Sequence, residues 1–391
     1  MKIGLLGFGT VGSGIYEIIS QNKNFQEKEI VISKILIRNK NKIKLNQMTI
    51  NPDDIFEDDN IDLIVEVMGG IQPAYEYILK SLNSGKHVVT ANKAVVSKYL
   101  NEFTEAAKRN NVAFLYEASV CGGIPWLDSL KRVKRIDEIS EVSGIFNGTS
   151  NFILYNMYDK SYDFNDILTI AQKKGYAEAD PSADIDGIDI QRKLAITSSI
   201  AFQSIVDEEN IPTHGIRNIT KSDINYFKEK KLILKLLALT IKRKNEYCSS
   251  VEPVLFKNNT IEANINDNFN IGTLVGETIG VLKFYGQGAG KLPTGNAIVQ
   301  DILDIYTKKD LINCSNFERK LICNPQLIKG KYYVRYTNKK VTELLLDILE
   351  NTFKISSAQG GITKEITLEK AQNIFNKIKS IDNKFFFARF S

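Results

Sequence analysis

The sequence predicts an α/β protein with three parts: a doubly wound parallel sheet at the N-terminus, an α+β domain after it, and a small C-terminal module. Three observations predict this order. Short apolar runs alternate with helical segments at the start of the chain, the alternation stops after Pro125-Trp126, and the last residues have a βαββαβ pattern of their own. The length of 391 residues is sufficient for two or three domains.

The N-terminal part is expected to form parallel strands that are buried on both faces. Such strands are nearly continuous apolar runs, because helices cover both faces of the sheet. Helical segments separate the runs, for example 73–84, which Gly85 ends as a C-cap. We therefore assign one doubly wound domain to residues 1–130, with strands at 2–6, 30–37, 61–67, 87–90 and 113–116.

The middle of the chain, residues 131–295, is expected to form an α+β domain. Its predicted strands are 139–146, 247–255 and 270–285, and its predicted helices are 163–174, 187–203 and 224–242. The glycine-rich segment 286–295 leads into a helix that should complete the N-terminal domain at about 296–310.

Residues 325–391 are predicted to form a separate module. Strand, helix, strand, strand, helix and strand follow one another at 331–337, 341–352, 353–358, 362–367, 368–380 and 384–390. This order is typical of ferredoxin-like (ACT-like) domains.

The composition excludes several classes of protein. The chain has 51 basic and 46 acidic residues, and the lysines are interleaved with acids, so no nucleic-acid footprint is expected. No apolar run reaches the length of a membrane span, and the N-terminus lacks the features of a signal peptide. The four cysteines lie far apart and form no metal-ligand pairs, so a cytoplasmic protein is expected; they are Cys121, Cys248, Cys314 and Cys323.

A glycine motif follows the first predicted strand and opens a helix. In this context GxGxxG indicates a dinucleotide-binding (Rossmann) domain. Gly7 allows a tight turn, Gly9 lets the backbone approach a pyrophosphate, and Gly12 permits close packing of helix and strand. We expect the cofactor to be held at the helix N-terminus by Gly7, Phe8, Gly9, Thr10, Val11 and Gly12.

The end of the second strand favours NADP(H) over NAD(H). An NAD site usually has an acid there, which binds the ribose 2′-hydroxyl. This chain instead has Arg38, with Lys40 and Lys42 close behind it. Arg38 is suited to hold a 2′-phosphate. The alternative is that these three residues are only exposed cations of a loop.

An acid-rich loop precedes the helix that begins near residue 187. Its carboxylates are Glu178, Asp180, Asp184 and Asp186, and Asp186 is expected to be the N-cap. Asp189 and Lys193 are four residues apart, so they share one helix face. They form either a functional pair or an ordinary surface ion pair. A calcium loop is excluded, because Lys193 occupies the position that needs a bidentate glutamate.

This region resembles the homoserine dehydrogenase family. The family signature A-x3-G-…-D-P-x2-D-x-x-G-x-D-x3-K matches Ala171, Gly175, Tyr176, Ala177, Asp180, Pro181, Asp184, Gly187, Asp189 and Lys193. Four further blocks are similar to the family in the same order: 90–94, 116–125, 147–151 and 286–290. The resemblance covers about residues 1–310 and implies interconversion of L-homoserine and L-aspartate 4-semialdehyde, in threonine, methionine and isoleucine biosynthesis.

The resemblance also implies roles for individual residues. Lys193 would be the proton donor to the C4 carbonyl oxygen; a lysine suits this role if burial or a second cation lowers its pKa from about 10.4. Lys93 resembles that second cation. Glu178 and Asp189 resemble partners of the substrate ammonium, and Tyr176 and Thr149 resemble donors to its amino-acid portion. Contacts to the cofactor are implied for Thr90, Lys93, Gly175 and Gly288.

The block 117–124 resembles a monovalent-cation loop of the family. Backbone carbonyls of Glu117, Val120, Gly122 and Ile124 would bind sodium, since carbonyl oxygens suit a hard, weakly held cation. A plain strand-to-helix turn is the alternative. The family also implies a homodimer or a larger homo-oligomer.

Two other functions are alternatives. The first is an aspartate-semialdehyde-type dehydrogenase with Cys121 as nucleophile, which would need a paired base; His87 is expected to be a core histidine, and His214 lies in a loop. The second is a non-catalytic NADP-binding regulatory protein, although such a protein has no need of both Lys93 and Lys193.

The C-terminal module is expected to respond little to threonine. ACT domains that it resembles often carry Asp-x-Pro-Gly in the first strand-to-helix turn, where a feedback amino acid binds. The turn at 336–341 lacks the acid, the proline and the glycine. The aromatic run 385–387 favours a packing role instead.

Overall fold

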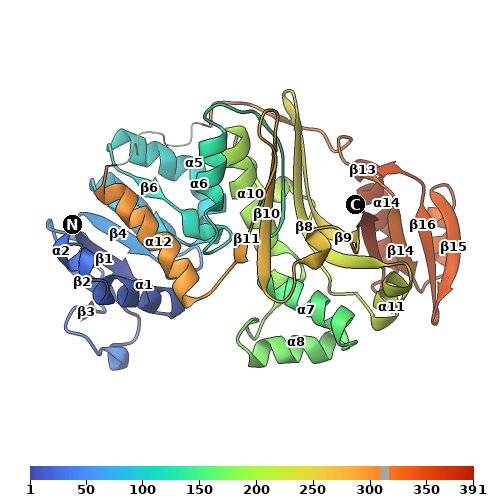
Figure 1. Ribbon diagram of the computed structural model, residues 1–391, viewed down its shortest axis with the longest axis horizontal. Helices are drawn as coiled ribbons and strands as arrows, with labels where there is room; N and C mark the ends of the chain where they lie inside the picture. The colour runs from blue at the N-terminus through green and yellow to red at the C-terminus, as the bar shows by residue number, and fades with distance from the viewer. Residues whose placement is uncertain (309–316) are drawn as a thin grey trace. The chain divides into compact units, whose positions relative to one another are not determined.

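The structure is a computed structural model that describes residues 1–308 and 317–391 (Figure 1). The chain forms two compact units, each treated by itself below. Unit 1 contains Met1–Arg135, Ala195–Glu208 and Gly286–Arg319; unit 2 contains Ile136–Leu194, Glu209–Tyr285 and Lys320–Ser391. Cys314 and the last two residues of the predicted segment 296–310 lie outside the described residues.

Unit 1 is built on a six-stranded parallel sheet. The strand order is β3-β2-β1-β4-β5-β6. The strands are β1 (Lys2–Leu6), β2 (Val31–Leu36), β3 (Met48–Thr49), β4 (Leu63–Glu66), β5 (His87–Thr90) and β6 (Phe114–Leu115). This is the order of the doubly wound dinucleotide-binding fold, which confirms the fold predicted for the start of the chain.

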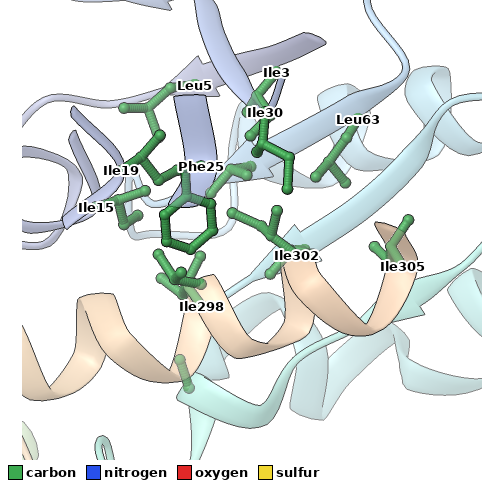
Figure 2. Close-up of a cluster of buried hydrophobic side chains, with 14 of the residues drawn as sticks. Ile3, Leu5, Ile15, Ile19, Phe25, Ile30, Leu63, Ile298, Ile302 and Ile305 are labelled. Carbon is green, nitrogen blue, oxygen red and sulfur yellow. The ribbon is translucent and has the colours of Figure 1, made fainter. Parts of the chain in front are cut away.

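Helices cover this sheet, and the last of them returns from far along the chain. They are α1 (Thr10–Gln21), α2 (Lys23–Glu27), α3 (Asp53–Phe56), α4 (Ala74–Asn83), α5 (Lys93–Arg109), α6 (Trp126–Val133) and α12 (Lys291–Tyr306). Figure 2 shows Ile298 and Ile302 of α12 in one apolar cluster with Ile15, Phe25 and Ile30. The helix predicted from Asn296 therefore begins earlier, at Lys291, and packs into the core of unit 1 as expected.

Unit 2 contains a ten-stranded sheet with the order β11-β10-β7-β8-β9-β18-β14-β16-β15, and β12 (Ile322–Cys323) pairs beside β9. Its first strands are β7 (Ile139–Ile145), β8 (Leu232–Arg243), β9 (Glu246–Lys257), β10 (Phe269–Gly276) and β11 (Gly280–Gln287). Its helices include α7 (Gly148–Asp159), α8 (Phe164–Lys173), α9 (Ser182–Ile185), α11 (Lys221–Glu229) and the beginning of α10 (Ile188–Phe202). The predicted α+β character is confirmed.

The helix predicted over 224–242 is wrong. Helix α11 ends at Glu229. Lys231 has a φ of 57°, in the left-handed region, and β8 follows it. Strand β8 pairs with β7 on one side and, over its whole length, with β9 on the other. Central pairing and burial produce a continuous apolar run, which in sequence is indistinguishable from a buried helix.

The C-terminal module has the predicted βαββαβ order. Its elements are β14 (Tyr332–Tyr336), α13 (Lys340–Leu345), β15 (Leu349–Ile355), β16 (Ala358–Thr363), α14 (Leu368–Ile381) and β18 (Phe386–Phe390), with a small pair β13 (Lys329–Gly330) and β17 (Ile366–Thr367). The helix predicted over 341–352 ends early, because its second half forms β15. Strand β18 pairs with β14 and also with β9, so the sheet of the module continues that of unit 2.

The aromatic run 385–387 is buried within the chain. Phe385 and Phe387 pack against Phe375 with ring centroids 5.4 and 4.6 Å apart. Phe386 lies beneath the Arg335 guanidinium, 6.0 Å from its ring centroid. These residues therefore have the predicted packing role inside the same chain.

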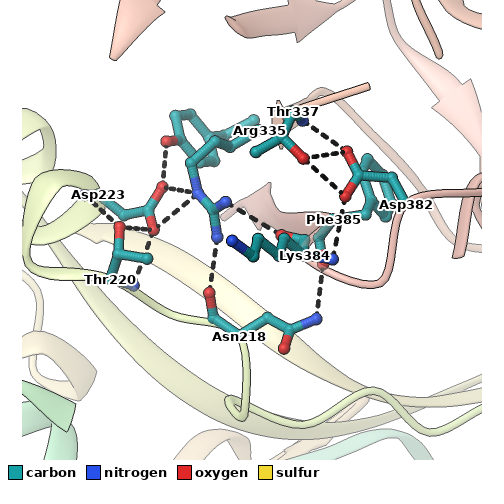
Figure 3. A network of polar contacts seen from close by, with 9 residues as sticks. Asn218, Thr220, Asp223, Arg335, Thr337, Asp382, Lys384 and Phe385 are labelled. Atoms are coloured by element: carbon teal, nitrogen blue, oxygen red, sulfur yellow. Dashed lines mark hydrogen bonds and ion pairs between the residues drawn. The ribbon is translucent and has the colours of Figure 1, made fainter. Parts of the chain in front are cut away.

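A buried ion pair joins the module to α11 (Figure 3). Arg335 Nε donates to both carboxylate oxygens of Asp223, at 2.8 and 3.0 Å. Arg335 Nη2 donates to Asn218 O at 2.6 Å. The Asp223 carboxylate also accepts from Tyr333 and closes a capping box with Thr220. Both side chains are nearly inaccessible, with 5% and 0% exposed.

The first prediction concerns this ion pair. Arg335→Met should lower the free energy of unfolding by about 3–5 kcal/mol, because the Asp223 charge would stay buried without its cation. Urea titration measures the change. The matched control is Lys331→Met, which breaks the exposed pair Lys331–Glu350 in the same module and should cost about 0–1 kcal/mol. Equal effects of the two substitutions would contradict the assignment.

Candidate functional site

The signature residues Asp189 and Lys193 form a buried ion pair on the first turns of α10. Lys193 Nζ lies 2.9 Å from Asp189 Oδ2, and only 10% and 6% of the two side chains are exposed. The surface ion pair considered from the sequence is therefore wrong. A charge pair removed from water is expensive unless further partners satisfy it.

Two adjacent residues after β7 provide those partners. Lys193 Nζ donates to Phe146 O at 2.7 Å. Asn147 Nδ2 donates to Asp189 Oδ2 at 2.9 Å and to Asp184 Oδ1 at 2.7 Å. The link from β7 to α7 thus holds both members of the pair.

Asp186 is not the N-cap of α10, contrary to the expectation. It stands at the C-terminal end of the short helix α9. Its carboxylate accepts from Arg217 Nε at 2.8 Å and from Arg217 NH2 at 2.6 Å. The first turn of α10 begins instead at Gly187, whose carbonyl accepts from Gln191 N and whose φ of 88° is accessible to glycine at little cost.

Thr149 and Tyr176 are brought together by a backbone contact. Thr149 Oγ1 donates to Tyr176 O at 2.6 Å, and the Tyr176 ring packs edge-on against Phe152 at 5.1 Å. Gly175 ends α8 with a φ of 76° and so turns the chain into this loop. Glu178 is exposed on the loop, and within the described part of the chain its carboxylate accepts no hydrogen bond.

The glycine turn in unit 1 leaves the start of α1 open. Gly7 has a φ of 105°, and a Cβ there would lie 2.9 Å from Val67 O. A Cβ on Gly12 would lie 2.2 Å from Gly7 O, whereas one on Gly9 would meet nothing within 4 Å. A tight turn, a close approach and an open backbone beside a helix N-terminus fit the pyrophosphate of a dinucleotide. Arg38 is exposed shortly after β2.

Thr90 lies at the carboxyl end of β5, next to a buried acid. Its Oγ1 donates to Glu66 Oε2 at 2.7 Å and accepts from Asn92 N at 3.0 Å. Burial raises the pKa of Glu66. Lys93 is the first residue of α5 and is partly exposed. Both residues predicted for the cofactor thus lie at the end of a parallel strand, where ligands bind in such sheets.

The predicted sodium loop is tightly organised. The buried Glu117 carboxylate accepts from Leu127 N at 2.9 Å and Asp128 N at 2.8 Å, and burial raises the pKa of Glu117 to about 8. A Cβ on Gly122 would lie 2.6 Å from Gly288 O. Of the four predicted carbonyls, Glu117 O accepts from Val120 N and Ile124 O accepts from Trp126 N, each leaving one lone pair.

The cysteine proposed as an alternative nucleophile is fully buried. Cys121 has no exposed surface, and its φ is 59°, a backbone conformation that favours glycine. His87 Nδ1 accepts from Ala113 N at 2.9 Å and so acts as a core histidine, as expected. His214 Nδ1 lies 2.6 Å from Lys379 Nζ. A buried thiol is a poor nucleophile, so this alternative loses its support.

Three groups of the site were not assigned from the sequence. They are the Phe146 carbonyl and the Asn147 amide, which contact the pair, and the Asp184 carboxylate, which accepts from Asn147. A signal for Asn147 exists, because asparagine before a helix is a typical N-cap. A backbone carbonyl leaves no signal in a sequence.

Neither a membrane span nor a side-chain metal site is found in the part of the chain that the structure describes. No helix there is long and apolar enough to cross a bilayer. No group of three or more His, Cys, Asp or Glu side chains there could hold a metal ion.

Comparisons with known proteins identify the family. The model of the homoserine dehydrogenase family matches residues 125–303, and that of the family's NAD-binding domain matches residues 7–117. A homoserine dehydrogenase of Synechocystis sp. is 39% identical over 316 residues, 78% of this chain and 73% of that protein. One of Lactococcus lactis is 35% identical over 366 residues, 90% of this chain and 86% of that protein.

Solved structures agree. The crystal structure of a homoserine dehydrogenase from Thiobacillus denitrificans has a TM-score of 0.89 and 32% identity, and the match covers 100% of this chain and 98% of that chain. One from Staphylococcus aureus has a TM-score of 0.77 and 29% identity, with the same coverage. The resemblance stated from the sequence is confirmed. The chain belongs to the homoserine dehydrogenase family, oxidoreductases that act on CH–OH groups with NAD(P).

Proposed function

We propose that Lys193 is the proton donor through which this enzyme reduces L-aspartate 4-semialdehyde to L-homoserine, with NADP(H) preferred over NAD(H). The observation that carries the proposal is the buried contact of Lys193 Nζ with Asp189 Oδ2 and Phe146 O. An ammonium group has three hydrogens, and these two acceptors orient two of them. The third is left for the carbonyl oxygen of the substrate.

Proton transfer in both directions follows from this arrangement. In reduction Lys193 gives its proton to the oxygen on C4, and in oxidation it takes the proton of the hydroxyl group. Asp189 keeps the amine in place through both steps. Lys93 is assigned as a second cation of the reaction that also contacts the cofactor.

The charges around the pair suit an amino-acid substrate. Asp184 and Asp189 carry two negative charges against the single positive charge of Lys193, and the exposed Glu178 adds a third. This excess favours the substrate ammonium, which we assign to Glu178 and Asp189. Thr149 and Tyr176 are assigned to the amino-acid portion of the substrate.

The cofactor is assigned to the open end of α1. When bound, its nicotinamide supplies or accepts the hydride. The backbone of Gly7, Phe8, Gly9, Thr10, Val11 and Gly12 would hold the pyrophosphate, Arg38 a 2′-phosphate, and Thr90, Lys93, Gly175 and Gly288 the remaining portions. A non-catalytic regulatory role is not favoured, since such a protein would gain nothing from a buried proton relay.

We propose three further properties beside this reaction. Sodium would be held by the carbonyl groups of Glu117, Val120, Gly122 and Ile124, among which Glu117 and Ile124 each keep a lone pair. The enzyme is proposed to be a homodimer or a larger homo-oligomer, and to act in the cytoplasm in threonine, methionine and isoleucine biosynthesis.

The second prediction concerns Lys193. Lys193→Ala should lower kcat about 10²–10⁴-fold while the Kd for NADPH stays the same, because only the proton transfer is lost. Lys193→Arg keeps a cation beside Asp189, but guanidinium does not release a proton near neutrality, so it should be nearly as inactive. Steady-state kinetics and NADPH titration measure both values.

The control for this experiment is Lys173→Ala, which removes an exposed lysine of α8. It should leave kcat unchanged. Near-normal turnover of Lys193→Arg would show that the residue contributes only charge, and the proposed proton transfer would then be wrong.

The third prediction concerns coenzyme preference. Arg38→Asp should move the preference from NADP toward NAD, because a cation for the 2′-phosphate becomes an acceptor for the 2′-hydroxyl. The ratio of kcat/KM for the two coenzymes measures the change. Lys28→Asp makes the same change of charge at an exposed residue of the same unit and should leave the ratio unaltered. An unchanged ratio in Arg38→Asp would refute the assignment.

The fourth prediction concerns the C-terminal module. The turn amide of Thr337 donates to Asp382 of the same chain at 2.5 Å (Figure 3), and that of Asn338 donates to it at 2.9 Å, so an internal carboxylate already occupies both amides. We therefore expect no inhibition by millimolar threonine. Removal of residues 325–391 should instead change oligomer size or solubility, because β9 loses its pairing with β18.

Light scattering and activity assays with threonine, and with serine as the control amino acid, measure these two effects. Threonine inhibition of the intact enzyme that disappears in the shortened chain would contradict the prediction. It would mean that the turn binds a free amino acid in spite of Asp382.

A further inference from the structure

The side-chain amide of Asn147 makes three contacts at the centre of the site. Its Oδ1 accepts from Ser150 N at 2.7 Å and thereby caps α7. Its Nδ2 donates to Asp184 Oδ1 at 2.7 Å and to Asp189 Oδ2 at 2.9 Å. Only 4% of the residue is exposed, so water has little access to these contacts.

The cap determines which way the amide faces. Ser150 N is a donor, so the oxygen of the amide must lie against it and the nitrogen must face the two acids. The two hydrogens of an amide nitrogen then match the two carboxylates, one each. Asp184 comes from α9 and Asp189 from α10, so one side chain connects the beginnings of three helices.

The Asn147 amide contacts the same oxygen of Asp189 that pairs with Lys193. Asp189 Oδ2 is the oxygen that lies 2.9 Å from Lys193 Nζ. It therefore stands between the Asn147 amide and the Lys193 ammonium, and its position is set from both sides. The same amide nitrogen donates to Asp184 Oδ1, so it links two carboxylates that would otherwise repel each other as like charges.

We infer that Asn147 is a positioning residue of the reaction: its amide holds Asp189 Oδ2 against Lys193 and separates Asp189 from Asp184. The inference rests on the proposed role of Lys193. Asn147 contributes to catalysis separately from its cap on α7, because it caps the helix with Oδ1 and positions Asp189 with Nδ2.

This division allows the two roles to be tested separately. Asparagine, aspartate and serine are about equally good N-caps, so Asn147→Asp and Asn147→Ser keep α7 capped. Neither variant has an amide nitrogen that could donate to Asp184 and Asp189. Asn147→Asp also adds a negative charge among Asp184, Asp189 and Lys193, whereas Asn147→Ser adds none.

Both variants are expected to lose kcat by about 10²-fold, since a displacement of the relay by about 1 Å has an effect of this size. The Kd for NADPH should stay within about twofold of wild type. In Asn147→Asp the pH profile of kcat should also move to higher pH, because a new carboxylate favours the protonated form of a neighbouring cation. In Asn147→Ser the profile should keep its position.

Rates are measured well below each melting transition and are expressed per folded molecule, so that a loss of stability does not imitate a loss of activity. The control is Asn22→Ser, at the exposed asparagine that caps α2 through Asn24 N at 3.0 Å. It should leave kcat and the pH profile unchanged.

Wild-type kcat in both Asn147 variants would overturn the inference and leave Asn147 as a helix cap only. Lys193→Arg, measured in the same series, separates this failure from that of the proposed function. If Lys193→Arg is inactive while both Asn147 variants match wild type, only the role of Asn147 is wrong. If Lys193→Arg is active, the proton relay itself is wrong.

Discussion

The ion pair of Lys193 and Asp189 is buried, and two buried charges are stable only when each keeps its remaining partners. Transfer of a charged group out of water costs several kcal/mol, on the order of the stability of a whole domain. Here the Phe146 carbonyl and the Asn147 amide meet that requirement. The position of the pair therefore depends on the position of the chain between β7 and α7, and not on α10 alone.

The architecture of unit 2 holds that segment in place. Strand β7 is paired on both sides, with β10 and β8, so its carboxyl end has little freedom. The same sheet continues through β9 into the C-terminal module, where the buried pair Arg335–Asp223 connects β14 with α11. The module is thus a structural part of unit 2. Its own carboxylate, Asp382, accepts from the amides of Thr337 and Asn338 in the first strand-to-helix turn.

The parts of the fold and of the site that the sequence predicts correctly are those that depend on local patterns of residues. Two examples are the glycine turn after β1 and the Asp189–Lys193 pair on α10. Each depends on residues close together in the chain, so their spacing can be recognised in the sequence. The strand β8 was mistaken for a helix because burial by two neighbouring strands removes the alternation that identifies a strand. Asp186 was misassigned because its partner, Arg217, is distant in sequence. The roles of Asn147 and Phe146 arise only from folding, since β7 brings them to α10.

In the proposed reaction, a fixed Lys193 ammonium directs its third hydrogen at the oxygen on C4 of the substrate. The most direct measurement is a crystal structure of the unproductive complex with NADPH and L-homoserine. We expect the substrate hydroxyl to lie within hydrogen-bonding distance of Lys193 Nζ while the contacts to Phe146 O and Asp189 Oδ2 remain. A substrate hydroxyl bound to another group, with Lys193 still engaged only by Asp189 and Phe146, would contradict it.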